Sequence, residues 1–158
     1  MKKILLSISL LTSVLSIAQA PEVVWAKTNG STTFDIMRAI ATDNTGNTIT
    51  VGDFTETADL DPSSLTQNFT SQGSSDIAIR KLNADGEVVW IKVIGGLYGV
   101  NGHDIAADNI GNIFVTGTFR GEVDFDPSTS TFNVGNSLNT SAQAFVLKLN
   151  SDGELVWV

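Results

Sequence analysis

The chain has 158 residues, with 17 acidic side chains against 9 basic ones, a single histidine and no cysteine. Its net charge of −8 disfavours binding to nucleic acid and to anionic membrane surfaces, because both repel an acidic protein. Without cysteine there are no disulfide bonds and no thiol chemistry, so packing and strand pairing must supply the stability.

Residues 1–18 have the pattern of a secretory signal peptide. Lys2 and Lys3 form a basic start, and an apolar run covers Ile4–Ile17. Cleavage after Ala18 is favoured over cleavage after residue 20, because the latter would place Pro21 first in the mature chain. Removing the two lysines brings the net charge to about −10. An uncleaved interfacial anchor is the alternative. The pattern therefore predicts a secreted or cell-surface protein with no membrane span after removal of the signal.

The rest of the chain contains an internal repeat of about 65 residues. The recurring stretches are Glu22–Trp25 with Glu87–Trp90, Asp43–Asn47 with Asp108–Asn112, Val51–Phe54 with Thr116–Phe119, and Asp59–Pro62 with Asp124–Pro127. A later pair, Lys81–Asn83 with Lys148–Asn150, is about two residues further apart. We assign residues 21–86 to a first repeat, 87–153 to a second and 154–158 to the start of a third. Such a period indicates a stacked or circular array.

Each repeat is predicted to contain four short strands joined by turns. In chain order the strands are expected at 35–43, 47–54, 76–82 and 87–93, and then at 104–108, 112–119, 143–149 and from 154 onward. Glycines such as Gly46 suit tight hairpins that need positive φ. The Ser- and Thr-rich links at 55–75 and 120–142 are expected to form an excursion on one face of the array. The glycine-rich stretch 95–102 is expected to be a flexible connector between units.

The fold class is therefore all-β, and four antiparallel strands per unit is the composition of a β-propeller blade. The motifs at 108–119, 124–127 and 148–157 resemble those of the SBBP β-propeller repeat family of exported bacterial proteins, with weaker copies at 43–54, 59–62 and 81–90. The resemblance implies antiparallel four-stranded blades, of which about two are present, in secreted or surface-attached proteins.

Two blades are fewer than the four to eight that close a propeller. Glu22–Lys27 is expected to be a fourth strand without the preceding three, and 154–158 a fourth strand that is cut short. We therefore favour a fragment of a longer array, in which further blades of the same chain are the partners. The alternative is self-association of copies into a closed ring.

Two pairs of aspartates are the best candidates for a metal site: Asp59 with Asp61, and Asp124 with Asp126. Carboxylates two residues apart can both face a Ca²⁺ ion, which takes six to eight oxygen ligands. However, Pro62 or Pro127 follows each pair at once, and Leu60 and Phe125 between the aspartates are expected to point into the core. We favour a structural turn over a weak calcium site.

No group of residues in the sequence indicates catalysis. His103 aligns with Arg38 of the first repeat and is interpreted as a polar strand or loop residue. The recurring Trp25, Trp90 and Trp157 are interpreted as packing between units rather than as a platform for sugars. No cofactor is expected apart from the calcium alternative.

The sequence thus predicts a non-catalytic binding or scaffold module with a protein or glycan partner. The alternatives are an extracellular carbohydrate-active enzyme whose catalytic residues lie outside this chain, and a calcium-stabilised structural repeat.

Overall fold

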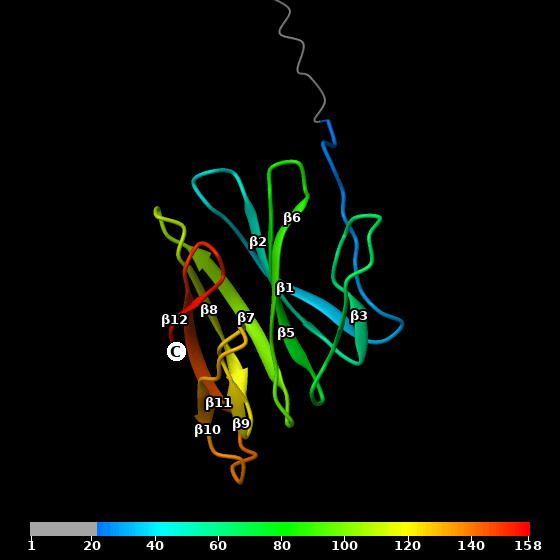
Figure 1. Ribbon diagram of the computed structural model, residues 1–158. Helices are drawn as coiled ribbons and strands as arrows, with labels where there is room; N and C mark the ends of the chain where they lie inside the picture. The colour runs from blue at the N-terminus through cyan, green and yellow to red at the C-terminus, as the bar shows by residue number, and fades with distance from the viewer. Residues whose placement is uncertain (1–21) are drawn as a thin grey trace, which may run out of the picture.

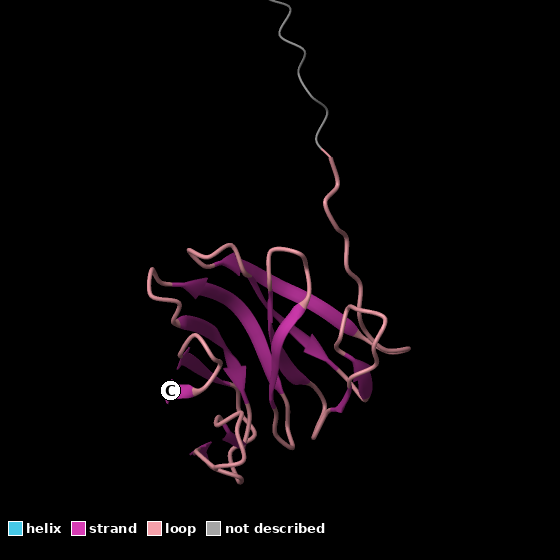
Figure 2. Ribbon diagram, turned by 45° about the horizontal axis from the view of Figure 1, so that its top comes forward, coloured by secondary structure: helices cyan, strands magenta, loops and turns pink. Residues whose placement is uncertain are grey.

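The computed structural model describes residues 22–158, and every regular element in that part of the chain is a β-strand (Figure 1). The predicted signal peptide, residues 1–18, lies outside the described residues. Two four-stranded antiparallel sheets dominate the fold. In Figure 2 the described part of the chain is drawn as strands and loops alone. The all-β, antiparallel fold class is confirmed.

The two large sheets have the same strand order. The first sheet has the order β1 (Asp35–Thr42), β2 (Thr48–Phe54), β5 (Asp76–Leu82) and β6 (Val88–Ile94). The second sheet has the order β7 (Val100–Ala107), β8 (Ile113–Phe119), β11 (Gln143–Leu149) and β12 (Leu155–Trp157). Apart from the start of β7, these bounds agree with the predicted strands to within one or two residues.

Hairpin turns join the first two strands and the last two strands of each sheet, as the glycines predicted. Gly46 has a φ of 84°, and its counterpart Gly111 has a φ of 86°. In both turns an aspartate that precedes the glycine, Asp43 or Asp108, accepts backbone N–H bonds from two later residues of the turn. The carboxylate therefore holds the turn, and the glycine supplies the left-handed backbone.

The two Ser- and Thr-rich links each contain a short hairpin. These are β3 (Thr57–Asp59) with β4 (Asn68–Thr70), and β9 (Glu122–Asp124) with β10 (Asn133–Gly135). Leu60 and Phe125, which follow β3 and β9, are buried as expected. Phe125 packs edge-on against Phe119 and Phe145 of the second sheet, with ring centroids 5.3 and 5.0 Å away. The excursions therefore fold back onto their own sheets.

The first sheet packs one face against the second sheet. β1 and β2 lie next to β7, and one continuous apolar core fills the space between the sheets. The fully buried strand residues of this core are Ile49, Val51, Ile77, Ile79 and Ile94 in the first sheet and Val100, Ile113, Val115, Leu147 and Leu149 in the second. Because side chains alternate along a strand, each sheet also has an outward face.

Two expectations were wrong. The stretch Val100–Gly102 was expected to be a flexible connector, but it forms the start of β7 and pairs with residues 117–119 of β8. Gly102 lies so close to the first sheet that an added Cβ would stand 2.6 Å from a methyl group of Val51. Its glycine therefore serves close packing, not flexibility. Glu22–Lys27 was expected to be a strand but has no strand pairing in the structure.

Candidate functional site

One tryptophan contact recurs in the chain, each time with a turn of the four-stranded sheet that follows the tryptophan. The indole Nε1–H of Trp25 donates to the carbonyl of Ala84, in the turn between β5 and β6, at 3.0 Å. Trp90, on β6, donates in the same way to the carbonyl of Ser151, in the turn between β11 and β12, at 3.2 Å. Both rings also cover the glycine of the turn that they bind, Gly86 or Gly153. The recurring tryptophan therefore connects the chain that precedes each four-stranded sheet to a turn of that sheet, and for Trp90 the preceding chain is the last strand of the first sheet.

Trp90 acts together with two neighbours on the same face of the first sheet. Lys81 pairs with Ile49 on one side and with Trp90 on the other. The Lys81 ammonium donates to the Ser151 carbonyl at 3.3 Å and forms an ion pair with Asp43 at 3.0 Å. Ile49 is fully buried in the shared core. Two members of the cross-strand row Ile49, Lys81 and Trp90 therefore hold the turn of the second sheet, the ammonium of Lys81 and the indole of Trp90.

The second sheet carries the same row on its outward face. Phe114, Lys148 and Trp157 are cross-strand neighbours, with the Lys148 ammonium 5.2 Å from the Phe114 ring and the two aromatic rings 6.2 Å apart. Trp157 is 44 % exposed, and Val146 is 49 % exposed where its counterpart Ile79 is fully buried. Among residues 22–158 no turn occupies this row. We call Phe114, Thr116, Val146, Lys148 and Trp157 the outward face of the second sheet.

The first pair of predicted site aspartates closes its own loop. Oδ1 of Asp59 accepts the backbone N–H groups of Asp61 and Gln67 at 3.1 and 2.9 Å. Oδ1 of Asp61 accepts the N–H of Ser63 at 2.8 Å. Both aspartates are half-buried. This arrangement accounts for the pair as a turn.

The second pair repeats that geometry. Asp124 accepts from the N–H groups of Asp126 and Phe132 at 3.0 and 2.8 Å, and Asp126 accepts from Ser128 at 2.9 Å. The hydrogen bond from Ser128 lowers the pKa of the Asp126 carboxyl. In the part of the chain that the structure describes, no third His, Cys, Asp or Glu joins either pair in a group that could hold a metal ion.

His103 lies on β7 and is exposed. Its counterpart Arg38 has a different environment, because Arg38 forms an ion pair of 2.6 Å with Asp53. The other oxygen of Asp53 accepts the backbone N–H of Gly102 at 2.8 Å and so links β2 to β7. This buried carboxylate joins the two sheets, and the sequence pattern did not identify it because the second repeat has Thr118 at that position.

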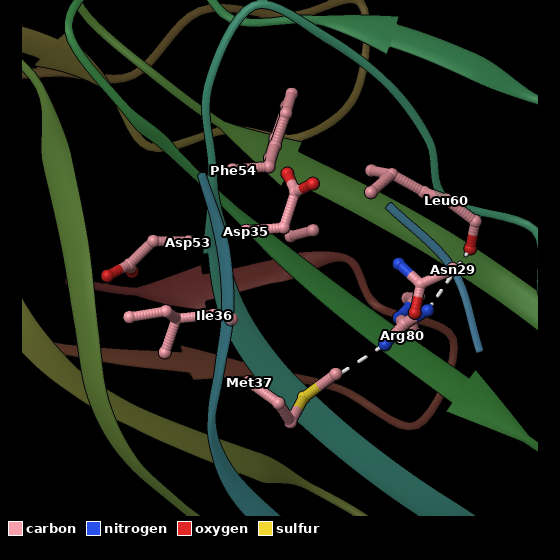
Figure 3. Close-up of a pocket in the computed structure, with 10 residues that line it drawn as sticks. Asn29, Asp35, Ile36, Met37, Asp53, Phe54, Leu60 and Arg80 are labelled. Atoms are coloured by element: carbon pink, nitrogen blue, oxygen red, sulfur yellow. Dashed lines mark hydrogen bonds between the residues drawn. The ribbon is translucent and has the colours of Figure 1, made fainter. Parts of the chain in front are cut away.

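The outward face of the first sheet contains a buried arginine. Arg80, on β5, is 5 % exposed. Its guanidinium donates to the Leu60 carbonyl at 3.3 Å and lies 4.0 Å from the sulfur of Met37, as the dashed lines of Figure 3 show. Within residues 22–158 no carboxylate lies within ion-pair distance of it. Burial lowers the pKa of this guanidinium.

Two cavities border Arg80. The smaller one, of about 110 Å³, is also lined by Asp35 and Asp53 (Figure 3). The larger one, of about 380 Å³, lies between the segment Trp25–Asn29 and the first sheet. The sequence interpretation missed Arg80. The only available signal was the mismatch between the repeats, since Leu147 stands at the aligned position.

No protein-family model matches the chain, and no curated protein is similar to it. Within the described residues, no helix is long and apolar enough to cross a membrane.

Proposed function

We propose that this protein is an exported, non-catalytic repeat module that binds or scaffolds partners, built from propeller-like blades of the type found in the SBBP repeat family. The recurring contact of a tryptophan with a turn of the sheet that follows it is the observation that supports this proposal most directly. An array held by one repeated contact supplies a rigid frame on which loops can vary.

The outward face of the second sheet is the place where the array extends. The row Phe114, Lys148 and Trp157 has the same register as the row that holds the Ser151 turn. A further four-stranded unit would offer a turn carbonyl to the Trp157 indole and to the Lys148 ammonium. It would also cover Val146, which is exposed without it.

The experiment is to lengthen the array by one unit. Residues 92–158 are repeated after Val158, so that the added turn can reach Trp157 as the Ser151 turn reaches Trp90. We expect one cooperative unfolding transition, a higher urea midpoint than that of the parent chain, and protection of Trp157 from acrylamide quenching. The control is the same extension with Trp157→Ala, which should lose most of the gain in midpoint.

Two results would contradict the proposal. One is a second, separate unfolding transition for the added residues. The other is a Trp157 that stays as accessible to acrylamide in the longer chain as in the parent.

A further inference from the structure

The larger cavity has a lining that is unusual for so acidic a chain. Its walls contain two basic side chains, Lys27 and Arg80, and no acidic one, although the chain has 17 acidic residues against 9 basic ones. Trp25 supplies an aromatic wall. A volume of about 380 Å³ is within the range of pockets that hold small ligands.

Two polar groups that border this cavity are buried without adequate partners. Arg80 has a carbonyl oxygen and a distant sulfur as its hydrogen-bond acceptors, but no carboxylate. The hydroxyl of Thr50 is buried and has no hydrogen-bond partner among the described residues. A buried charge without a counter-charge is costly, and so is a buried polar group without a partner. Both groups would be satisfied by an acidic ligand that also carries hydroxyl groups.

The acidic side chains near the smaller cavity do not supply the missing counter-charge of Arg80. Asp53 is already paired with Arg38 and with the N–H of Gly102. One oxygen of Asp35 accepts from the backbone and hydroxyl of Ser31. Its other oxygen has no partner, and it forms no ion pair with Arg80.

The second repeat shows that the fold does not require this polar lining. Three polar residues of the first sheet border the larger cavity, whereas the second repeat has apolar residues at the aligned positions and packs them into the core. The pairs are Thr48 with Ile113, Thr50 with Val115, and Arg80 with Leu147. The outward face of the first sheet is therefore not a copy of the apolar face that receives another unit.

We propose that the cavity between Trp25–Asn29 and the first sheet binds an acidic sugar, with its carboxylate paired to Arg80 and Lys27. The Thr50 hydroxyl bonds a hydroxyl group of the ligand, and Trp25 forms the apolar wall against its ring. This inference rests on the proposed role as a binding module and names the class of its ligand. It does not involve the outward face of the second sheet. A result that contradicts extension of the array therefore leaves ligand binding in the cavity to be decided by its own test.

The test is titration of the mature chain, Gln19–Val158, with D-glucuronate, followed by the Trp25 indole signal in ¹H–¹⁵N NMR spectra. D-Glucose is the neutral probe of the same shape, and N-acetylglutamate carries a carboxylate without the sugar ring. We expect saturable shifts of the Trp25 signal with D-glucuronate, none with D-glucose, and weaker binding of N-acetylglutamate.

Matched variants locate the site. Arg80→Gln should weaken D-glucuronate binding by about tenfold or more. Lys27→Gln should weaken it by about threefold, as expected for a more exposed charge. Because Lys27 lies on an exposed segment without strand pairing, this variant remains informative if Arg80→Gln fails to fold. Lys92→Gln is the control, since Lys92 has the corresponding position against Gly153 but does not line the cavity.

Absence of saturable binding would overturn the proposal. Equal binding of D-glucose would exclude recognition of the carboxylate. Equal or tighter binding of N-acetylglutamate would exclude the sugar, and equal weakening by Lys27→Gln and Lys92→Gln would exclude the cavity as the site.

Discussion

Replacing Trp90 by alanine removes the side chain that connects the first sheet to the turn of the second. Trp90 is half-buried against the shared core, and its indole N–H is bonded to the Ser151 carbonyl. Truncating a fully buried Trp costs about 4 kcal/mol, so a half-buried one should cost about 2 kcal/mol. Losing the hydrogen bond adds about 1 kcal/mol or less, because Lys81 still donates to the same carbonyl. We therefore expect Trp90→Ala to lower the free energy of unfolding by about 2–3 kcal/mol.

Urea unfolding followed by circular dichroism measures this change, with the slope against urea expected to stay constant. The corresponding loss in melting temperature is about 6–9 °C for a chain of this size. Trp157→Ala is the matched control, because Trp157 occupies the same position in the second repeat but contacts no further turn within residues 22–158. We expect it to cost less than about 1 kcal/mol. Equal losses for the two variants would refute the assignment of Trp90 to a contact between units.

Three other perturbations, two of them substitutions and one a change of pH, act on the turn carboxylates. Asp43→Ala should lower the free energy of unfolding in urea by about 3 kcal/mol, because it leaves the Lys81 ammonium buried without its carboxylate. Asp108→Ala, which breaks a similar turn without an ion pair, should cost clearly less. Equal costs for the two substitutions would contradict this explanation. Burial alone would raise the pKa of Asp43, but hydrogen bonds from Asn47, Thr45 and Lys81 outweigh it and hold that pKa well below the ordinary 3.8. The stabilisation that the Asp43 carboxylate contributes is therefore present above about pH 4 and is lost as pH falls towards the lowered pKa. Acid titration of stability should therefore be steeper for the parent chain than for Asp43→Asn. Asp124→Asn should change the unfolding free energy by less than about 1 kcal/mol, because both backbone N–H groups bond to Oδ1, which an amide oxygen can replace. Neither calcium nor a chelator should move the melting temperature. A rise in melting temperature with calcium that Asp124→Asn abolishes would establish the calcium-stabilised alternative.

The strand pattern could be predicted because its causes are local. Thr48–Phe54 and Ile113–Phe119 are rich in residues that favour strands, and a glycine turn precedes each of them. The equal spacing of the repeats then places corresponding strands in corresponding positions of the two sheets. Leu60 and Phe125 were assigned to the core for the same local reason, the alternation of side chains at a strand end.

What the sequence did not reveal depends on contacts between distant segments. Val100–Gly102 has the composition of a linker, yet it becomes a strand because Gly102 allows close approach to Val51 and donates its N–H to Asp53. Arg80 lies within a predicted strand, and only the folded sheet shows that it is buried beside a cavity. The short hairpins in the Ser- and Thr-rich links escaped prediction because three-residue strands have too little pattern to recognise.

Hydrogen exchange of the three indole N–H groups, measured by ¹⁵N NMR on a dilute sample, reports directly on the repeated contact. Two of these groups, in Trp25 and Trp90, are bonded to turn carbonyls, whereas the third faces outward on the second sheet. The repeat-array interpretation predicts slow exchange for Trp25 and Trp90 and fast exchange for Trp157. Equal, fast exchange at all three positions would contradict it, because neither Trp25 nor Trp90 would then be bonded to a turn of the sheet that follows it.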